Sequence, residues 1–204
     1  MSRTLADRLS ADHRALFAPA FVESAELRAA LARQPDLAAT FDAFGRLAVA
    51  VVGIGAIGAG DATARSSLLE SGALSEAEIR GLRAKGAAGD LVVHAFDASG
   101  AFIAPDLALR AVAIDVEQLR RTRVLAVAGG AGKAIAIRGA LSTGVVGMLV
   151  TDAAAARAML ESSEPAGPGA EAAGAAPAAV NPVRRRGAAR GSARRATATD
   201  RRRA

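Results

Sequence analysis

The chain has 204 residues and a mass of 20.4 kDa, enough for one α/β domain and a short extension. Its residues are 51% hydrophobic and 23% charged, which excludes a wholly disordered protein. There is no cysteine, which excludes disulfides, thiolate metal sites and thiol catalysis. Aromatic residues make up only 3%, too few to offer a stacking platform for single-stranded nucleic acid.

The positive charge is concentrated at the C-terminal end. Residues 1–160 carry a net charge of +1, whereas residues 161–204 hold nine arginines against four acidic residues. Residues 163–204 are also rich in Ala, Pro and Gly and show no helical or strand period, so we expect a disordered tail. Its arginines could bind DNA non-specifically, although a solvated tail without a role explains the pattern too.

No targeting signal is visible. Residues 1–15 alternate charged and apolar side chains, unlike a signal peptide, and we expect an irregular segment there. The longest apolar stretch, 48–59, has 12 residues and three glycines, which is too short to span a bilayer. We therefore expect a cytoplasmic protein that does not associate with membranes.

Strand-like and helix-like segments alternate along the chain. Apolar runs predict strands at 47–52, 91–96, 102–103, 111–114, 124–128 and 145–150, with a tight turn at Asp97–Gly100. Helices are predicted at 25–34, 75–85, 115–121, 132–141 and 153–162.

Capping residues mark several of these helices. Ser24 is expected to begin the first helix and Pro35 to close it from outside, whereas Ser75 and Glu78 form a capping box for 75–85. Asp115 and Asp152 are expected to cap later helices. The alternation predicts an α/β fold with a mostly parallel sheet flanked by helices.

The segment Gly53–Gly58 reads GIGAIG directly after a predicted strand, which matches the G-x-G-x-x-G dinucleotide pattern. A dinucleotide fold also needs an acidic residue at the end of a second strand about 20 residues on, and that position falls in the capped helix. We therefore expect no nucleotide cofactor. A glycine turn lining a small-ligand crevice is the better interpretation.

The segment 128–134, AGGAGKA, also follows a strand and opens a helix. It departs from the Walker pattern, because Val127 replaces the first glycine and Ala134 replaces the Ser or Thr. Free amides, a helix N-terminus and the Lys133 ammonium nevertheless favour an anion. The alternative is a surface lysine on a first helical turn.

Other polar residues give weaker signals. Asp90 stands at the entry to a strand, where it could accept hydrogen bonds from sugar hydroxyls or finish a turn. His94 is expected to be a strand histidine whose hydrogen bonds are satisfied. No nucleophile triad, paired carboxylates or metal-ligand cluster is visible.

Four ordered blocks resemble a known family: 52–56, 71–100 (with GAAGD and FDASG), 110–120, and 124–160 (with AGGAGKAIAI and LVTDAAAA). Together with LFAPAFVESAELRAALARQPDL at 16–37, they are similar to the sugar-binding domain of SorC-type, DeoR-like transcriptional regulators. The resemblance covers about residues 16–160, and the expected sugar-binding domain is 16–162, incomplete at its N-terminal end.

This resemblance implies a sugar-phosphate isomerase-like fold that binds a phosphorylated sugar at the carboxyl edge of its sheet, without catalysis, and acts in a homo-oligomer. It places Lys133, Gly129 and Gly130 against a phosphate or sugar oxygen. Asp90 would hold a hydroxyl, and the Gly53 and Gly55 turn would form the floor. Asp152 is expected to cap the last helix.

The chain departs from the family at its N-terminal end. The helix-turn-helix and the first part of the sensor domain have no counterpart, so the chain resembles a truncated regulator that contacts DNA only indirectly. Two other functions stay open: an isomerase-like enzyme acting on sugar phosphates, and a nucleic-acid-associated protein acting through the arginine tail.

Overall fold

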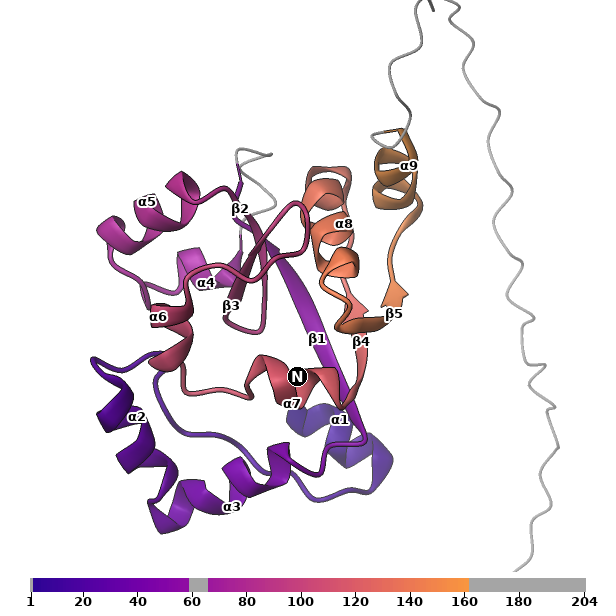
Figure 1. Ribbon diagram of the computed structural model, residues 1–204. Coiled ribbons are helices and arrows are strands. Elements are labelled where there is room, and N and C mark those ends of the chain that lie inside the picture. Colours follow the sequence, from indigo (N-terminus) through magenta and orange to yellow (C-terminus); the bar gives the residue numbers. More distant parts are fainter. Residues whose placement is uncertain (1, 59–65, 162–204) are drawn as a thin grey trace, which may run out of the picture. The chain divides into compact units, whose positions relative to one another are not determined.

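A five-stranded sheet with helices packed against it forms the centre of the chain (Figure 1). The computed structural model describes residues 2–58 and 66–161. The predicted disordered tail, 163–204, lies outside the described residues.

The sheet has the order β3-β2-β1-β4-β5. The central strand β1 (Val49–Ala56) pairs in parallel with β4 (Arg123–Val127), which pairs in parallel with β5 (Val146–Val150). On its other side β1 pairs antiparallel with β2 (Ala87–Leu91), and β2 pairs antiparallel with β3 (His94–Asp97). The α/β class is confirmed, but the prediction of a mostly parallel sheet is wrong, because the sheet is mixed.

A tight turn explains part of this difference. The predicted strand 91–96 is broken at Val92, whose φ of 62° reverses the chain between β2 and β3. So short a connection can join only antiparallel strands. The sequence gives no sign of this turn, because the residues in it and most of those on both sides are apolar, as in a continuous strand.

The described helices are short, and several of them begin at a capping side chain. The predicted caps are confirmed: the side chains of Ser24, Ser75, Asp115 and Asp152 each accept a hydrogen bond from a backbone N–H three residues on. The bounds are α1 Ser2–Leu9, α2 Ala25–Ala32, α3 Pro35–Phe44, α4 Ser67–Glu70, α5 Glu76–Ala84, α6 Pro105–Leu109, α7 Val116–Arg120, α8 Ala134–Ser142 (preceded by the 3₁₀ turn η2, Ala131–Lys133) and α9 Ala153–Glu161.

Three local predictions need correction. Residues 2–9 are helical where an irregular segment was expected. Pro35 begins α3 rather than only closing the preceding helix, because proline is well suited to the first turn. Residues 111–114 form no strand; Ala111 makes only an isolated bridge to Phe21.

The turn at Asp97–Gly100 is confirmed. The Asp97 carboxylate accepts hydrogen bonds from the amides of Ser99 and Ala101, at 2.9 and 3.0 Å. The strand expected beyond it is a single bridge between Phe96 and Phe102. The predicted hairpin is therefore a tight turn with one bridge after it.

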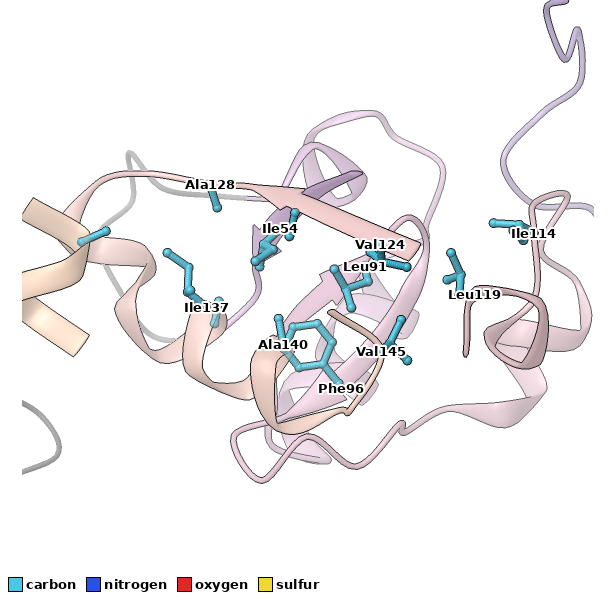
Figure 2. Packing of buried hydrophobic residues seen from close by; sticks show 13 residues of the cluster. Ile54, Leu91, Phe96, Ile114, Leu119, Val124, Ala128, Ile137, Ala140 and Val145 are labelled. Atoms are coloured by element: carbon cyan, nitrogen blue, oxygen red, sulfur yellow. The ribbon is translucent and has the colours of Figure 1, made fainter. Parts of the chain in front are cut away.

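One face of the sheet is covered by α8, whose Ile137 and Ala140 are fully buried in one cluster with Phe96 and Val124 (Figure 2). A second apolar cluster lies under α4, α5 and α6 and includes Ile57, Leu68, Ile79, Leu82 and Leu107. Among the helices described, none is long and apolar enough to span a bilayer.

Candidate functional site

A cavity of about 420 Å³ lies along β1 and its carboxyl end. It is bounded by β1, by the end of β2, by α4 and by Lys133 at the start of α8. Its described lining consists of Val51, Val52, Gly53, Ile54, Gly55, Ser67, Glu70, Asp90, Val92 and Lys133. Four of the six residues predicted as site residues, Gly53, Gly55, Asp90 and Lys133, therefore meet in one cavity.

Asp90 is held at the inner side of this cavity by β2, where it stands opposite Gly55 of β1. Its side chain is buried, and one carboxylate oxygen accepts a hydrogen bond from the hydroxyl of Ser66. Ser66 is itself fully buried and caps α4, because its hydroxyl oxygen also accepts from the Leu68 amide at 3.0 Å. The carboxylate is thus fixed before any ligand arrives.

Gly55 makes this arrangement possible. The prediction of a turn at Gly53 and Gly55 is wrong, because β1 continues through both glycines to Ala56 and they pair with the neighbouring strands. A Cβ atom at position 55 would overlap the Asp90 carboxylate and the Ser66 hydroxyl. A Cβ atom at Gly53 would meet no atom within 4 Å. The two glycines therefore differ: Gly55 leaves room for the polar pair, and Gly53 leaves the cavity wall open.

Lys133 reaches back from the η2 turn toward β1. Its Nζ atom donates a hydrogen bond to the Ile54 carbonyl oxygen at 3.0 Å. The ammonium group retains two further hydrogens for a ligand. This bond anchors the cation at the cavity, on the same side as Asp90.

Burial raises the pKa of Asp90 from its ordinary 3.8 to about 6, although the Ser66 hydrogen bond and the Lys133 charge both lower it. Loss of hydration is the larger effect, because a buried carboxylate is costly to charge. Asp90 therefore changes its charge close to neutral pH. A strongly shifted pKa in a cavity is a mark of a binding or catalytic site.

The two remaining predicted residues, Gly129 and Gly130, do not line this cavity. The Gly130 amide donates to Asp152 at 2.7 Å, and a Cβ at Gly129 would overlap the same carboxylate. In this structure the Gly130 amide is thus paired with Asp152, and the expectation that the Gly129 and Gly130 amides face a ligand stays a prediction. Parallel pairing of β4 and β5 brings Asp152 to the start of η2, where its charge satisfies the free amide.

Asp152 caps α9 as well, accepting from the Ala155 amide at 2.8 Å, so the predicted capping role is confirmed. The bonds from Ala155 and Gly130 hold the pKa of Asp152 below its ordinary value. One carboxylate thereby joins the start of η2 to the start of α9.

Sequence reasoning missed Ser66, Ser67 and Glu70. The signal was present in SSLLE, where a serine precedes a short apolar run as an N-cap does. Nothing in that pattern indicated that the capping hydroxyl would also reach a carboxylate 24 residues away.

His94 is buried on β3, away from this cavity. Its Nε2 atom lies 2.8 Å from the Ile114 carbonyl oxygen, and burial lowers its pKa. Its other ring nitrogen finds no hydrogen-bond partner, so the expectation of a fully satisfied histidine holds for one nitrogen only. No cluster of acidic or histidine residues that could hold a metal ion occurs within 2–58 and 66–161.

Comparisons with known proteins place this geometry in a family. Residues 1–161 match the Sugar-bind family, described as "Putative sugar-binding domain". The chain is 32% identical over 142 residues to the erythritol catabolism regulatory protein EryD of Brucella abortus, covering 70% of this chain and 43% of EryD. It is 34% identical over 145 residues to the transcriptional regulator LsrR of Klebsiella pneumoniae, covering 70% and 44%.

Solved structures agree with the sequence comparisons. The sugar-binding domain of a transcriptional repressor from Vibrio fischeri superposes with a TM-score of 0.66 at 29% identity, over 78% of this chain and 62% of that one. The full-length sorbitol operon regulator SorC of Klebsiella pneumoniae gives 0.65 at 26% identity, over 76% and 49%. The chain spans less than half the length of the curated relatives named above. It belongs to the Sugar-bind family, the sugar-binding domains of SorC- and DeoR-type transcriptional regulators.

Proposed function

We propose that this chain is an effector-sensing domain that binds a phosphorylated sugar in the cavity of Asp90 and Lys133, without turning it over. One observation carries the proposal. In a chain of the sugar-binding family, a fixed carboxylate and a fixed ammonium group meet at one cavity beside the two glycines of β1. The cavity volume, about 420 Å³, lies in the range of small-molecule sites, roughly 300–1,000 Å³.

Each residue has a chemical task in this proposal. The Asp90 carboxylate accepts hydrogen bonds from sugar hydroxyls, and Lys133 donates to a hydroxyl or phosphate oxygen. The main chain at Gly53 lies open, so the sugar can approach β1 closely. The described lining holds one cation, Lys133, against the carboxyls of Asp90 and Glu70, so hydroxyl recognition contributes at least as much as phosphate recognition.

Calorimetric titration of the full chain with a panel of pentose and hexose phosphates, and with the same sugars unphosphorylated, tests the proposal. We expect binding of at least one sugar phosphate, with loss of about tenfold or more in affinity for Lys133→Ala, because a charge-assisted hydrogen bond contributes about 1.5–3 kcal/mol.

The chain contains one natural control, because its only other lysine is Lys85. Lys85 stands at the C-cap of α5 and does not line the cavity. The Lys85→Ala variant should therefore bind the sugar phosphate with the same affinity as the unsubstituted chain. If no sugar on the panel binds, or if both lysine variants lose affinity equally, the proposed site is wrong. Conversion of a bound sugar phosphate into a product would instead show that the chain is an enzyme.

We infer a separate, non-specific contact with nucleic acid through the arginines of 162–204, supported by the charge of that segment alone. Deleting 167–204 should abolish polynucleotide binding and its steep salt dependence while sugar affinity is retained. Equal polynucleotide binding by the deleted and full chains contradicts this part of the proposal.

A further inference from the structure

A second cavity, of about 160 Å³, is bounded by the start of β3, by residues 102–104, by α6 and by the start of α7. It shares no described lining residue with the cavity of Asp90 and Lys133. Its described lining consists of His94 and nine apolar residues, and no charged side chain is among them. The cavity is therefore suited to an uncharged and largely apolar molecule.

His94 is the polar side chain in that described lining. It is 5% exposed, and its Nε2 atom lies 2.8 Å from the Ile114 carbonyl oxygen. Because a carbonyl oxygen only accepts hydrogen bonds, Nε2 carries the ring hydrogen and Nδ1 keeps a free lone pair. Burial lowers the pKa of His94, which holds the ring in this neutral form at pH 7.

The Nδ1 atom of His94 finds no hydrogen-bond partner among the described residues. Buried polar atoms in folded proteins nearly always have one, and an acceptor left unpaired in the interior destabilises the fold. A ligand that donates a hydrogen bond to Nδ1 removes this cost. The neutral imidazole therefore favours a ligand with a hydroxyl or N–H group over one that can only accept.

The size of the cavity and its aromatic wall restrict the ligand further. Phe102 also lines the cavity, and its ring is perpendicular to that of His94, with the centroids 6.4 Å apart. A cavity of roughly 150 Å³ in an engineered protein holds a benzene molecule. One six-membered ring with a single hydroxyl group thus fits both the volume and the chemistry of this cavity.

We propose that this cavity is a second binding site, for a small, uncharged aromatic alcohol whose hydroxyl group donates a hydrogen bond to Nδ1 of His94 and whose ring packs beside Phe102. The inference does not depend on which ligand the cavity of Asp90 and Lys133 binds, because the two cavities have separate linings.

Phenol and toluene are matched probes of this site, because a methyl group replaces the hydroxyl group in a molecule of nearly the same shape. Without a partner in the cavity, the phenol hydroxyl would lose its hydrogen bonds to water and phenol would bind the more weakly of the two. With Nδ1 as its acceptor, we expect phenol to bind at least as tightly as toluene in calorimetric titrations of the full chain. No binding of phenol, or weaker binding than that of toluene, overturns the proposal.

A cavity-filling variant locates the bound phenol. Ala108 of α6 lines the cavity, so the larger side chain of Ala108→Leu should occupy it and weaken phenol binding at least tenfold. The matched control is Ala84→Leu on α5, since Ala84 is exposed and does not line this cavity. Equal affinity of the two variants for phenol shows that the assigned cavity is wrong.

Nitrogen NMR of isotope-labelled imidazole rings gives an answer that does not rely on a variant folding. The chain has two histidines, and the second, His13, does not line the cavity. Phenol should shift the Nδ1 resonance of His94, because that atom gains a hydrogen bond, and should leave the His13 resonances in place. An unshifted His94, or equal shifts of the two histidines, contradicts the assigned contact.

Discussion

Asp90 is a buried carboxyl group whose surroundings shift its pKa. Its folded pKa is raised to about 6 from 3.8, so the folded chain holds the proton more tightly than the unfolded chain. The proton on Asp90 therefore stabilises the fold as pH falls through 6, and this contribution is complete below the unfolded value. At pH 7 and above it is absent, and the buried charge is a cost.

The first prediction concerns pH. Between pH 7.5 and pH 5, this group should add about 1 kcal/mol to the free energy of unfolding, from a shift of roughly 1.4 kcal/mol per pKa unit. Asp90→Asn keeps the oxygen that accepts the hydrogen bond from Ser66 but cannot titrate. The free energy of unfolding of this variant should therefore rise less between pH 7.5 and pH 5 than that of the unsubstituted chain. Urea denaturation of both chains at the two pH values measures the difference, and parallel pH profiles would contradict it.

The second prediction concerns the two glycines of β1. Gly55→Ala would press a methyl group against the Asp90 and Ser66 side chains, so it should lower the free energy of unfolding by about 1–3 kcal/mol. Gly53→Ala, two residues earlier on β1, meets open space and should change stability by less than about 1 kcal/mol. Urea denaturation of the two variants measures both changes. Equal losses of stability would show that glycine is not needed at position 55 to make room for the Asp90 and Ser66 side chains.

At the level of elements, Asp152 joins two helix starts with one carboxylate. Asp152→Ala leaves the Ala155 and Gly130 amides without their acceptor and should therefore lower the free energy of unfolding. Asp152→Asn keeps one acceptor oxygen and should lose less. Because Asp152 does not line the cavity, sugar affinity measured by calorimetry should stay unchanged in both variants, whereas an Asp152 that touched the ligand would lower it.

At the scale of the whole molecule, the two faces of the sheet have different surroundings. Ile137 of α8 is fully buried against the covered face, so Ile137→Ala should lower the free energy of unfolding by about 2–5 kcal/mol. Ile135→Ala, on the same helix but 61% exposed, should cost less than about 1 kcal/mol. Thermal and urea unfolding of the two variants measures how much the packing of α8 against the sheet contributes to the free energy of unfolding.

Short-range chemistry accounts for what could be predicted. The capping boxes at Ser75 and Asp115 and the turn at Asp97 depend on atoms within four residues, and all three appear as expected. The strands β4 and β5 follow from short, apolar runs. The resemblance of four ordered blocks to SorC-type regulators was likewise readable from the chain alone, and the family is confirmed.

Long-range contacts account for the rest. Whether β2 runs with or against β1, whether Ser66 reaches Asp90, and which acid meets the Gly130 amide all depend on segments 20 or more residues apart. A free helix amide attracts any nearby anion, and local sequence does not say whether that anion is a ligand or Asp152. Residue chemistry along the chain thus determined the family, the caps and the pairing of Asp90 with Lys133 as binding candidates. Only the tertiary structure placed those two in one cavity and excluded Gly129 and Gly130 from it, because strand pairing sets which distant groups meet.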